Sequence, residues 1–188
     1  GYFTRLWNER VNAELKGDLV SMLAHGEHTR NMTPQEYLGN LILLIVGGND
    51  TTRNSMTGGV LGMMKEWPGQ WAKLKADSSL LQSAVSEIIR WQTPLAHMRR
   101  TALQDYEIGG KTIRKGDKVL MWYVSGNRDE TQYTRPNDLW IERPMVRRHL
   151  SFGFGIHRCV GNRLAELQLQ ILWEEILKRF EHIEVLGE

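Results

Sequence analysis

A second cysteine is absent from this chain, so no internal disulfide can form and Cys159 is the only thiol. This cysteine usage is compatible with a reducing compartment, and we expect a cytoplasmic protein. Long apolar runs are also missing. The most apolar segment, residues 38–46, is interrupted by Gly39 and Asn40 and is far shorter than the ~18–20 residues of a membrane-spanning helix. No signal peptide is visible, so we expect no membrane anchor.

An excess of charge of one sign is lacking as well. The 24 Lys and Arg against 22 Asp and Glu give a net charge of +2, which is too small and too dispersed to indicate nucleic-acid binding. With 188 residues, 41% of them hydrophobic, the chain can form one globular unit with a sizeable core. Cationic residues near the cysteine could form a patch for an acidic electron donor, although ordinary surface charge explains them equally well. They are Arg147, Arg148, Arg158 and Arg163.

The hydrophobic periodicity predicts a mainly α-helical chain with small β-sheets. We expect helices over residues 2–15, 18–25, 33–66, 70–76, 80–92 and 159–180. A hairpin around Gly109-Gly110 is expected over residues 106–113 and a further strand over 118–123, followed by an irregular segment over 129–148. The last helix has an apolar stripe that we expect to face the core. Its members are Val160, Leu164, Leu167 and Ile171.

The lone cysteine follows a glycine-rich segment, Ser151-Phe152-Gly153-Phe154-Gly155-Ile156-His157-Arg158-Cys159-Val160-Gly161. Its glycines let backbone amides approach the sulfur without Cβ clashes, and the helix that follows places its positive dipole end beside it. Both effects favour the thiolate. A single activated thiolate indicates the axial ligand of a haem iron, which needs only one ligand from the protein. A buried structural cysteine and a redox-active thiol are the alternatives.

Two upstream motifs precede this loop. Gly47, Asp50 and Thr51 share one face of the predicted helix over residues 33–66, and the adjacent glycines there weaken the helix by roughly 1 kcal/mol each relative to alanine. Glu87 and Arg90 lie three residues apart on the predicted helix over 80–92 and can form an ion pair.

The motif Phe-Gly-x-Gly-x-His-x-Cys-x-Gly, complete from Phe152 to Gly161, resembles the haem-binding loop of the cytochrome P450 monooxygenases. The two upstream motifs occur in the order that this family has. The resemblance implies haem b as the cofactor, with Cys159 as the metal ligand and with Phe152 and Gly153 in the loop that holds the haem.

The resemblance assigns an acid–alcohol pair, here Asp50 and Thr51, to proton delivery during cleavage of the O–O bond. The glycines beside them, Gly47 and Gly48, could then form a notch where O2 and water lie against the helix backbone. A packing notch for a neighbouring helix is the alternative, with Asp50 and Thr51 as ordinary hydrogen-bonded polar groups.

The resemblance also gives the Glu87–Arg90 pair a partner. In the family, a glutamate and two arginines form a buried network that anchors the cysteine loop, and Arg143 is at the position of the second arginine. Such a buried network is tolerated only when its charges are paired and hydrogen-bonded.

The haem carboxylates need cationic or hydrogen-bonding partners. Arg100 matches the family arginine that meets a propionate, His157 matches another partner, and we add His149 as a third candidate. Arginine suits this role because its planar guanidinium binds a carboxylate in a bidentate manner. The neighbouring Arg99 fits a solvated strand residue.

Within the family, three segments resemble the bacterial alkane terminal hydroxylases: residues 43–55, 91–100 and 121–128. The resemblance implies a small hydrophobic substrate, O2, and electrons from a ferredoxin and its flavin-dependent reductase. We expect six residues to line the substrate pocket above the iron, although core packing would favour the same aliphatic types. They are Leu43, Leu44, Gly47, Gly48, Leu95 and Ala96.

The resemblance extends over residues 1–188 but covers only the C-terminal half of the family fold. We therefore expect a partial haem-thiolate domain, without the N-terminal half and the final hairpin. Two hypotheses follow. One is a monooxygenase that hydroxylates the terminal carbon of an alkane or fatty acid, of which this fragment alone is inactive. The other is a polypeptide that binds haem without catalysis, either a sensor-like module or an inert truncated product.

Overall fold

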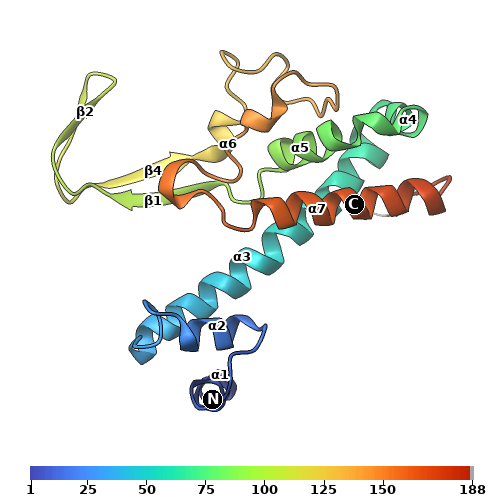
Figure 1. The fold of residues 1–188 in the computed structure, drawn as a ribbon. Helices are drawn as coiled ribbons and strands as arrows, with labels where there is room; N and C mark the ends of the chain where they lie inside the picture. Colours follow the sequence, from blue (N-terminus) through green and yellow to red (C-terminus); the bar gives the residue numbers. More distant parts are fainter. Residues whose placement is uncertain (187–188) are drawn as a thin grey trace. The chain divides into compact units, whose positions relative to one another are not determined.

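A computed structural model describes residues 1–186 and shows a mainly helical chain with two small antiparallel sheets (Figure 1). The predicted fold class is therefore confirmed. The chain divides into two compact units, Gly1–Gly47 and the part from Gly48 onward. Among the described residues, no helix combines the length and the apolar character that crossing a membrane requires.

The first unit contains α1 (Tyr2–Val11), α2 (Leu19–His25) and the first part of α3 (Pro34–Leu61). The helix start predicted at Thr33 is a capping box: the Thr33 N–H donates to Glu36 Oε2 at 2.8 Å, and the Glu36 N–H donates to Thr33 Oγ1 at 3.3 Å. Helix α1 ends four residues earlier than predicted. Asn12 follows it and donates its side-chain amide to the Asn8 carbonyl at 2.9 Å, which satisfies an end group of the helix.

The second unit continues α3 through a π-helical turn and contains the remaining elements in chain order. They are the π-turn Gly62–Glu66, α4 (Pro68–Ala76), α5 (Leu81–Gln92), β1 (His97–Thr101), β2 (Tyr106–Ile108), β3 (Lys111–Ile113), β4 (Lys118–Trp122), α6 (Tyr123–Gly126) and α7 (Asn162–Arg179). Short 3₁₀ turns occur at Ser78–Leu80, Val146–Arg148 and Gly155–His157. The segment between α6 and α7 is otherwise irregular, as predicted.

Both sheets are two-stranded. Strand β1 pairs with β4, with His97 opposite Trp122, and β2 pairs with β3. The β2–β3 turn contains Gly109 and Gly110 at φ +56° and +71°, the left-handed region in which glycine is favoured. The predicted hairpin is therefore confirmed.

The core of the second unit lies where α5 and α7 pack against each other and against the meander, the irregular segment 129–148. On α7 the buried residues are Leu169, Trp173 and Ile176. The predicted core stripe is wrong: its members are 50–99% exposed, because α7 carries two apolar faces and only the other one meets α5. The exposed members are Val160, Leu164, Leu167 and Ile171.

Candidate functional site

The cysteine loop is shaped by two left-handed glycines. Gly153 and Gly155 have φ of +69° and +72°, so a residue with a Cβ would be strained at either position. The Cys159 N–H donates to the Phe152 carbonyl at 2.8 Å, which closes the loop on itself. Helix α7 begins at Asn162, three residues later than predicted, and the sulfur lies just before the helix end whose dipole favours an anion, as expected.

The thiol of Cys159 is free and exposed. The side chains around it are apolar and almost fully exposed: Phe154 at 84%, Ile156 at 96% and Val160 at 99%. Among the described residues, no group of three His, Cys, Asp or Glu side chains could hold a metal ion. One thiolate within an apolar surface suits the axial side of a haem, whose porphyrin supplies the other ligands and covers apolar groups. The residues present therefore fit this cofactor.

The structure brings Glu87, Arg90 and Arg143 together in a buried network. Arg90 Nε and Nη2 donate to the two carboxylate oxygens of Glu87 at 2.7 and 2.9 Å, and Arg143 Nε lies 3.0 Å from both oxygens. The side chains of Glu87 and Arg90 are fully buried, and that of Arg143 is 2% exposed. One carboxylate thus binds two guanidinium groups away from water.

The remaining guanidinium N–H groups bind backbone carbonyls. Arg90 donates to Asn127, Pro136 and Asp138 at 2.6–3.0 Å, and Arg143 donates to Thr134, Arg135 and Asp138. The network therefore fixes the path of the meander that leads to the cysteine loop. The sequence did not predict these carbonyl partners, because they come from a segment without periodicity.

Replacing Glu87 with glutamine is expected to lower the free energy of unfolding by about 3–5 kcal/mol, because two buried guanidinium groups lose the carboxylate charge that both of them bind. Chemical denaturation of the full-length protein measures this. The matched control is Glu142→Gln. Glu142 binds Lys73, but both side chains are 40–51% exposed, so this change should have little effect. Equal losses for the two variants would contradict the prediction.

The three predicted propionate partners have different surroundings. Arg100 is partly buried on β1 and donates to the Arg99 carbonyl at 3.0 Å, whereas His157 is exposed in the 3₁₀ turn of the loop. His149 is 4% exposed and accepts the Ser151 N–H at Nδ1 at 3.2 Å. Burial, with a smaller contribution from nearby arginines, lowers the pKa of His149 to about 4. His149 can offer a carboxylate an N–H donor, but its burial opposes a positive charge.

On α3, Asp50 forms an ion pair and Thr51 forms a hydrogen bond. Asp50 Oδ1 lies 2.6 Å from Arg53 Nη2 in an exposed ion pair, and the Thr51 carbonyl accepts the Ser55 hydroxyl at 3.0 Å. A Cβ added at Gly48 would meet no atom within 4 Å among the described residues, and the same holds at Gly47.

The close packing on α3 occurs further along the helix. A Cβ at Gly59 would lie 2.9 Å from Ile88, and one at Gly62 would lie 3.0 Å from Leu139. Gly58 is packed as well, since a Cβ there would clash with the Gln92 side chain. Among the described residues, Gly58, Gly59 and Gly62 are therefore packing glycines, and the role of Gly47 and Gly48 stays a prediction.

The predicted substrate-pocket residues are largely exposed. In the first unit, Leu43 is 68% exposed and Leu44 is partly buried. In the second unit, Leu95 is 38% exposed and Ala96 is also exposed, in the segment that joins α5 to β1. Ala96 accepts the Val124 N–H at its carbonyl at 3.2 Å.

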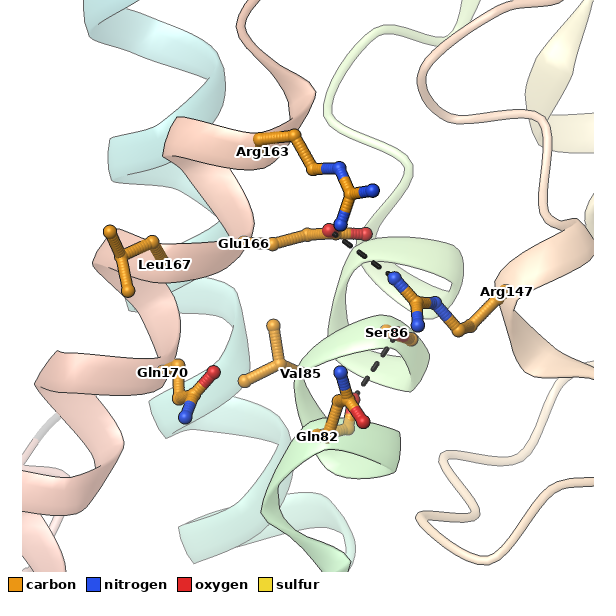
Figure 2. Close-up of a pocket in the computed structure, with 8 residues that line it drawn as sticks. All are labelled: Gln82, Val85, Ser86, Arg147, Arg163, Glu166, Leu167 and Gln170. Carbon is orange, nitrogen blue, oxygen red and sulfur yellow. Dashed lines mark hydrogen bonds and ion pairs between the residues drawn. The ribbon is translucent and has the colours of Figure 1, made fainter.

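A pocket that the sequence did not predict lies between α5 and α7 (Figure 2). Its volume is about 230 Å³, and Arg147 Nη2 lies 3.7 Å from Glu166 Oε2 across it. Two of the predicted patch arginines, Arg147 and Arg163, thus lie beside an acid that offsets part of their charge. The lining residues are Gln82, Val85, Ser86, Arg147, Arg163, Glu166, Leu167 and Gln170.

Comparison with known proteins is consistent with this geometry. The family model described as Cytochrome P450 matches residues 71–186. The chain is 42% identical over 185 residues to linalool 8-monooxygenase of Pseudomonas putida, covering 96% of this chain and 45% of that protein. The chain therefore spans about half the length of the curated relatives it matches.

Solved structures agree closely. Cytochrome P450-153 from Novosphingobium aromaticivorans matches with a TM-score of 0.93 and 56% identity, over 100% of this chain and 46% of that one. P450BioI, in complex with an acyl carrier protein ligated to hexadec-9Z-enoic acid, matches with a TM-score of 0.87 and 34% identity, over 100% of this chain and 47% of that one.

Proposed function

Because the chain belongs to the cytochrome P450 family, whose members are haem b thiolate enzymes, we propose that it is the C-terminal part of a haem-thiolate monooxygenase. The observation that carries this proposal is the exposed Cys159 in its glycine-shaped loop before α7. When bound, haem b would supply an iron at which O2, two electrons and two protons convert a C–H bond to a C–OH group and one water. A cytoplasmic location remains a prediction from the cysteine usage.

The residues of this chain then have separate tasks. Cys159 would hold the iron through its thiolate, and Phe152 and Gly153 would shape the loop that carries this cysteine. Arg100 and His157 would bind the haem carboxylates, with His149 as a further N–H donor. The Glu87 network holds the meander from which the loop starts.

On α3, Thr51 would offer its hydroxyl for proton delivery. Asp50 would connect this hydroxyl to solvent, since its carboxylate is exposed. The arrangement would supply the protons that O–O cleavage consumes.

We assign the substrate as an aliphatic chain hydroxylated at its terminal carbon, a medium-chain alkane or fatty acid. Leu43 and Leu44 in the first unit, and Leu95 and Ala96 in the second, are all aliphatic, as contacts to such a chain would be. The fatty-acyl chain in the P450BioI complex supports the same chemical class. The electrons would come from a ferredoxin and its flavin-dependent reductase. The ferredoxin would dock near the cationic residues around the cysteine, Arg147, Arg148, Arg158 and Arg163.

The test is a carbon monoxide difference spectrum of the reduced full-length protein, followed by product analysis on octane with a ferredoxin and reductase. A thiolate-type Soret band and a terminal alcohol support the proposal. A band without any hydroxylated product favours the non-catalytic haem protein. Absence of the band contradicts both.

Residues 1–188 expressed alone are expected to aggregate and to bind haem below one equivalent. The reason is the large exposed apolar surface, which includes Leu43 on α3 and both Leu164 and Val160 near the cysteine. Size-exclusion chromatography and haem quantification measure this. A monomeric, haem-replete sample with a sharp thermal transition would contradict the prediction and the partial-domain assignment.

A further inference from the structure

Asn127 is fully buried where three chain segments meet. These are the residue that follows α6, the residue that follows α5, and the start of the cysteine loop. Its Nδ2 donates to Thr93 Oγ1 at 2.9 Å and to Ser151 Oγ at 2.8 Å. Its Oδ1 accepts the Leu150 N–H at 2.6 Å. Both donor hydrogens and the acceptor of the amide are therefore used.

The two hydroxyls that bind Asn127 are themselves fixed. Thr93 Oγ1 donates to the Arg90 carbonyl at 2.5 Å, and Ser151 Oγ donates to the Ile89 carbonyl at 2.8 Å. Because each hydroxyl has one hydrogen, each can meet Asn127 only as an acceptor. A side chain with two donors and one acceptor is required at position 127, and an amide supplies that set.

The contacts continue from Asn127 to the sulfur-bearing residue. The Leu150 carbonyl accepts the Gly153 N–H at 2.8 Å, and the Phe152 carbonyl accepts the Cys159 N–H at 2.8 Å. The Glu87 network binds carbonyls of the meander and the carbonyl of Asn127, whereas the side chain of Asn127 binds the start of the loop itself.

We propose that Asn127 is a positioning residue for the thiolate ligand, acting through Ser151 and Leu150 to hold the backbone that presents Cys159 to the haem. This inference rests on the proposed function. A loop that loses this clamp no longer has the backbone of Leu150 and Ser151 fixed, so the Phe152–Cys159 hydrogen bond that orients the sulfur is weakened.

The first test measures how fast the reduced carbon monoxide complex of the full-length protein converts from a thiolate-type to a thiol-type Soret band in mild denaturant. Asn127→Ala and Ser151→Ala should convert about tenfold faster than the parent, since each removes buried hydrogen bonds of the clamp. Ser151→Thr keeps the hydroxyl and should restore the parent rate. Ser86→Ala is the matched control, because Ser86 is buried on α5 and its hydroxyl donates to the Gln82 carbonyl, away from the loop.

The second test needs no haem. Amide hydrogen exchange of Cys159 in the haem-free protein should be about tenfold faster in Ser151→Ala than in Ser86→Ala, since the Phe152–Cys159 bond is loosened. Equal exchange in Ser151→Ala and Ser86→Ala overturns the positioning role. Equal rates of band conversion in these two variants also overturn it, provided that both substitutions lower the melting temperature by the same amount. Absence of a thiolate band in the parent protein instead overturns the proposed function, while the exchange comparison still decides whether Asn127 holds the loop.

Discussion

Cys159→Ala is expected to abolish the thiolate-type Soret band of the reduced carbon monoxide complex in the full-length protein. The chain contains no other cysteine, so no second thiolate can replace the lost ligand. The loop itself should survive, because its closing bond joins the backbone N–H of residue 159 to the Phe152 carbonyl and does not involve the sulfur. We therefore expect the variant to lose the thiolate-type Soret band completely while it keeps its fold.

Val160→Ala is the matched control for this experiment. Val160 is 99% exposed and adjacent to the sulfur, and truncating it removes apolar surface without touching the thiolate. We expect the band to remain, with weaker haem retention measured by haem transfer to an acceptor protein. If Cys159→Ala keeps a thiolate-type band, the axial ligand is not Cys159, and the proposed function loses its main support.

The parts of the fold that local chemistry determines were predictable from sequence. The capping box of Thr33 and Glu36 and the Gly109-Gly110 turn depend on contacts within a few residues, so their sequence signals are sufficient. The buried face of α7 was not predictable. Leu164 and Trp173 are both apolar, and only tertiary packing decides which of the two faces α5 covers.

The candidate site divides in the same way. Cys159 and the Glu87–Arg90 pair were identified from sequence because each belongs to a short motif of neighbouring residues. The clamp on the loop was missed, since Asn127 and Ser151 lie 24 residues apart and neither belongs to a periodic pattern. A signal did exist in the fold: a buried amide whose every polar atom is paired indicates a fixed junction between segments.

Thr51→Ala is expected to uncouple electron consumption from hydroxylation in the full-length protein. The change removes the hydroxyl proposed for proton delivery while the helix retains its backbone, including the Thr51 carbonyl that accepts the Ser55 hydroxyl. Losing one positioned proton-transfer group commonly slows its step by ~10²–10⁴-fold. Substrate affinity should hardly change, because it depends on aliphatic contacts. Electrons should then reduce O2 to hydrogen peroxide instead of supporting alcohol formation.

The decisive measurement is the ratio of alcohol product to NADH consumed, with hydrogen peroxide quantified alongside. Asp50→Asn should slow turnover more than it lowers this ratio, because the Thr51 hydroxyl remains and only proton resupply is impaired. Thr57→Ala is the control: its hydroxyl donates to the Arg53 carbonyl on the same helix, and its loss should leave the ratio at the parent value. If Thr51→Ala also leaves the ratio unchanged, Thr51 is a hydrogen-bonded structural residue and the proton-delivery role is wrong.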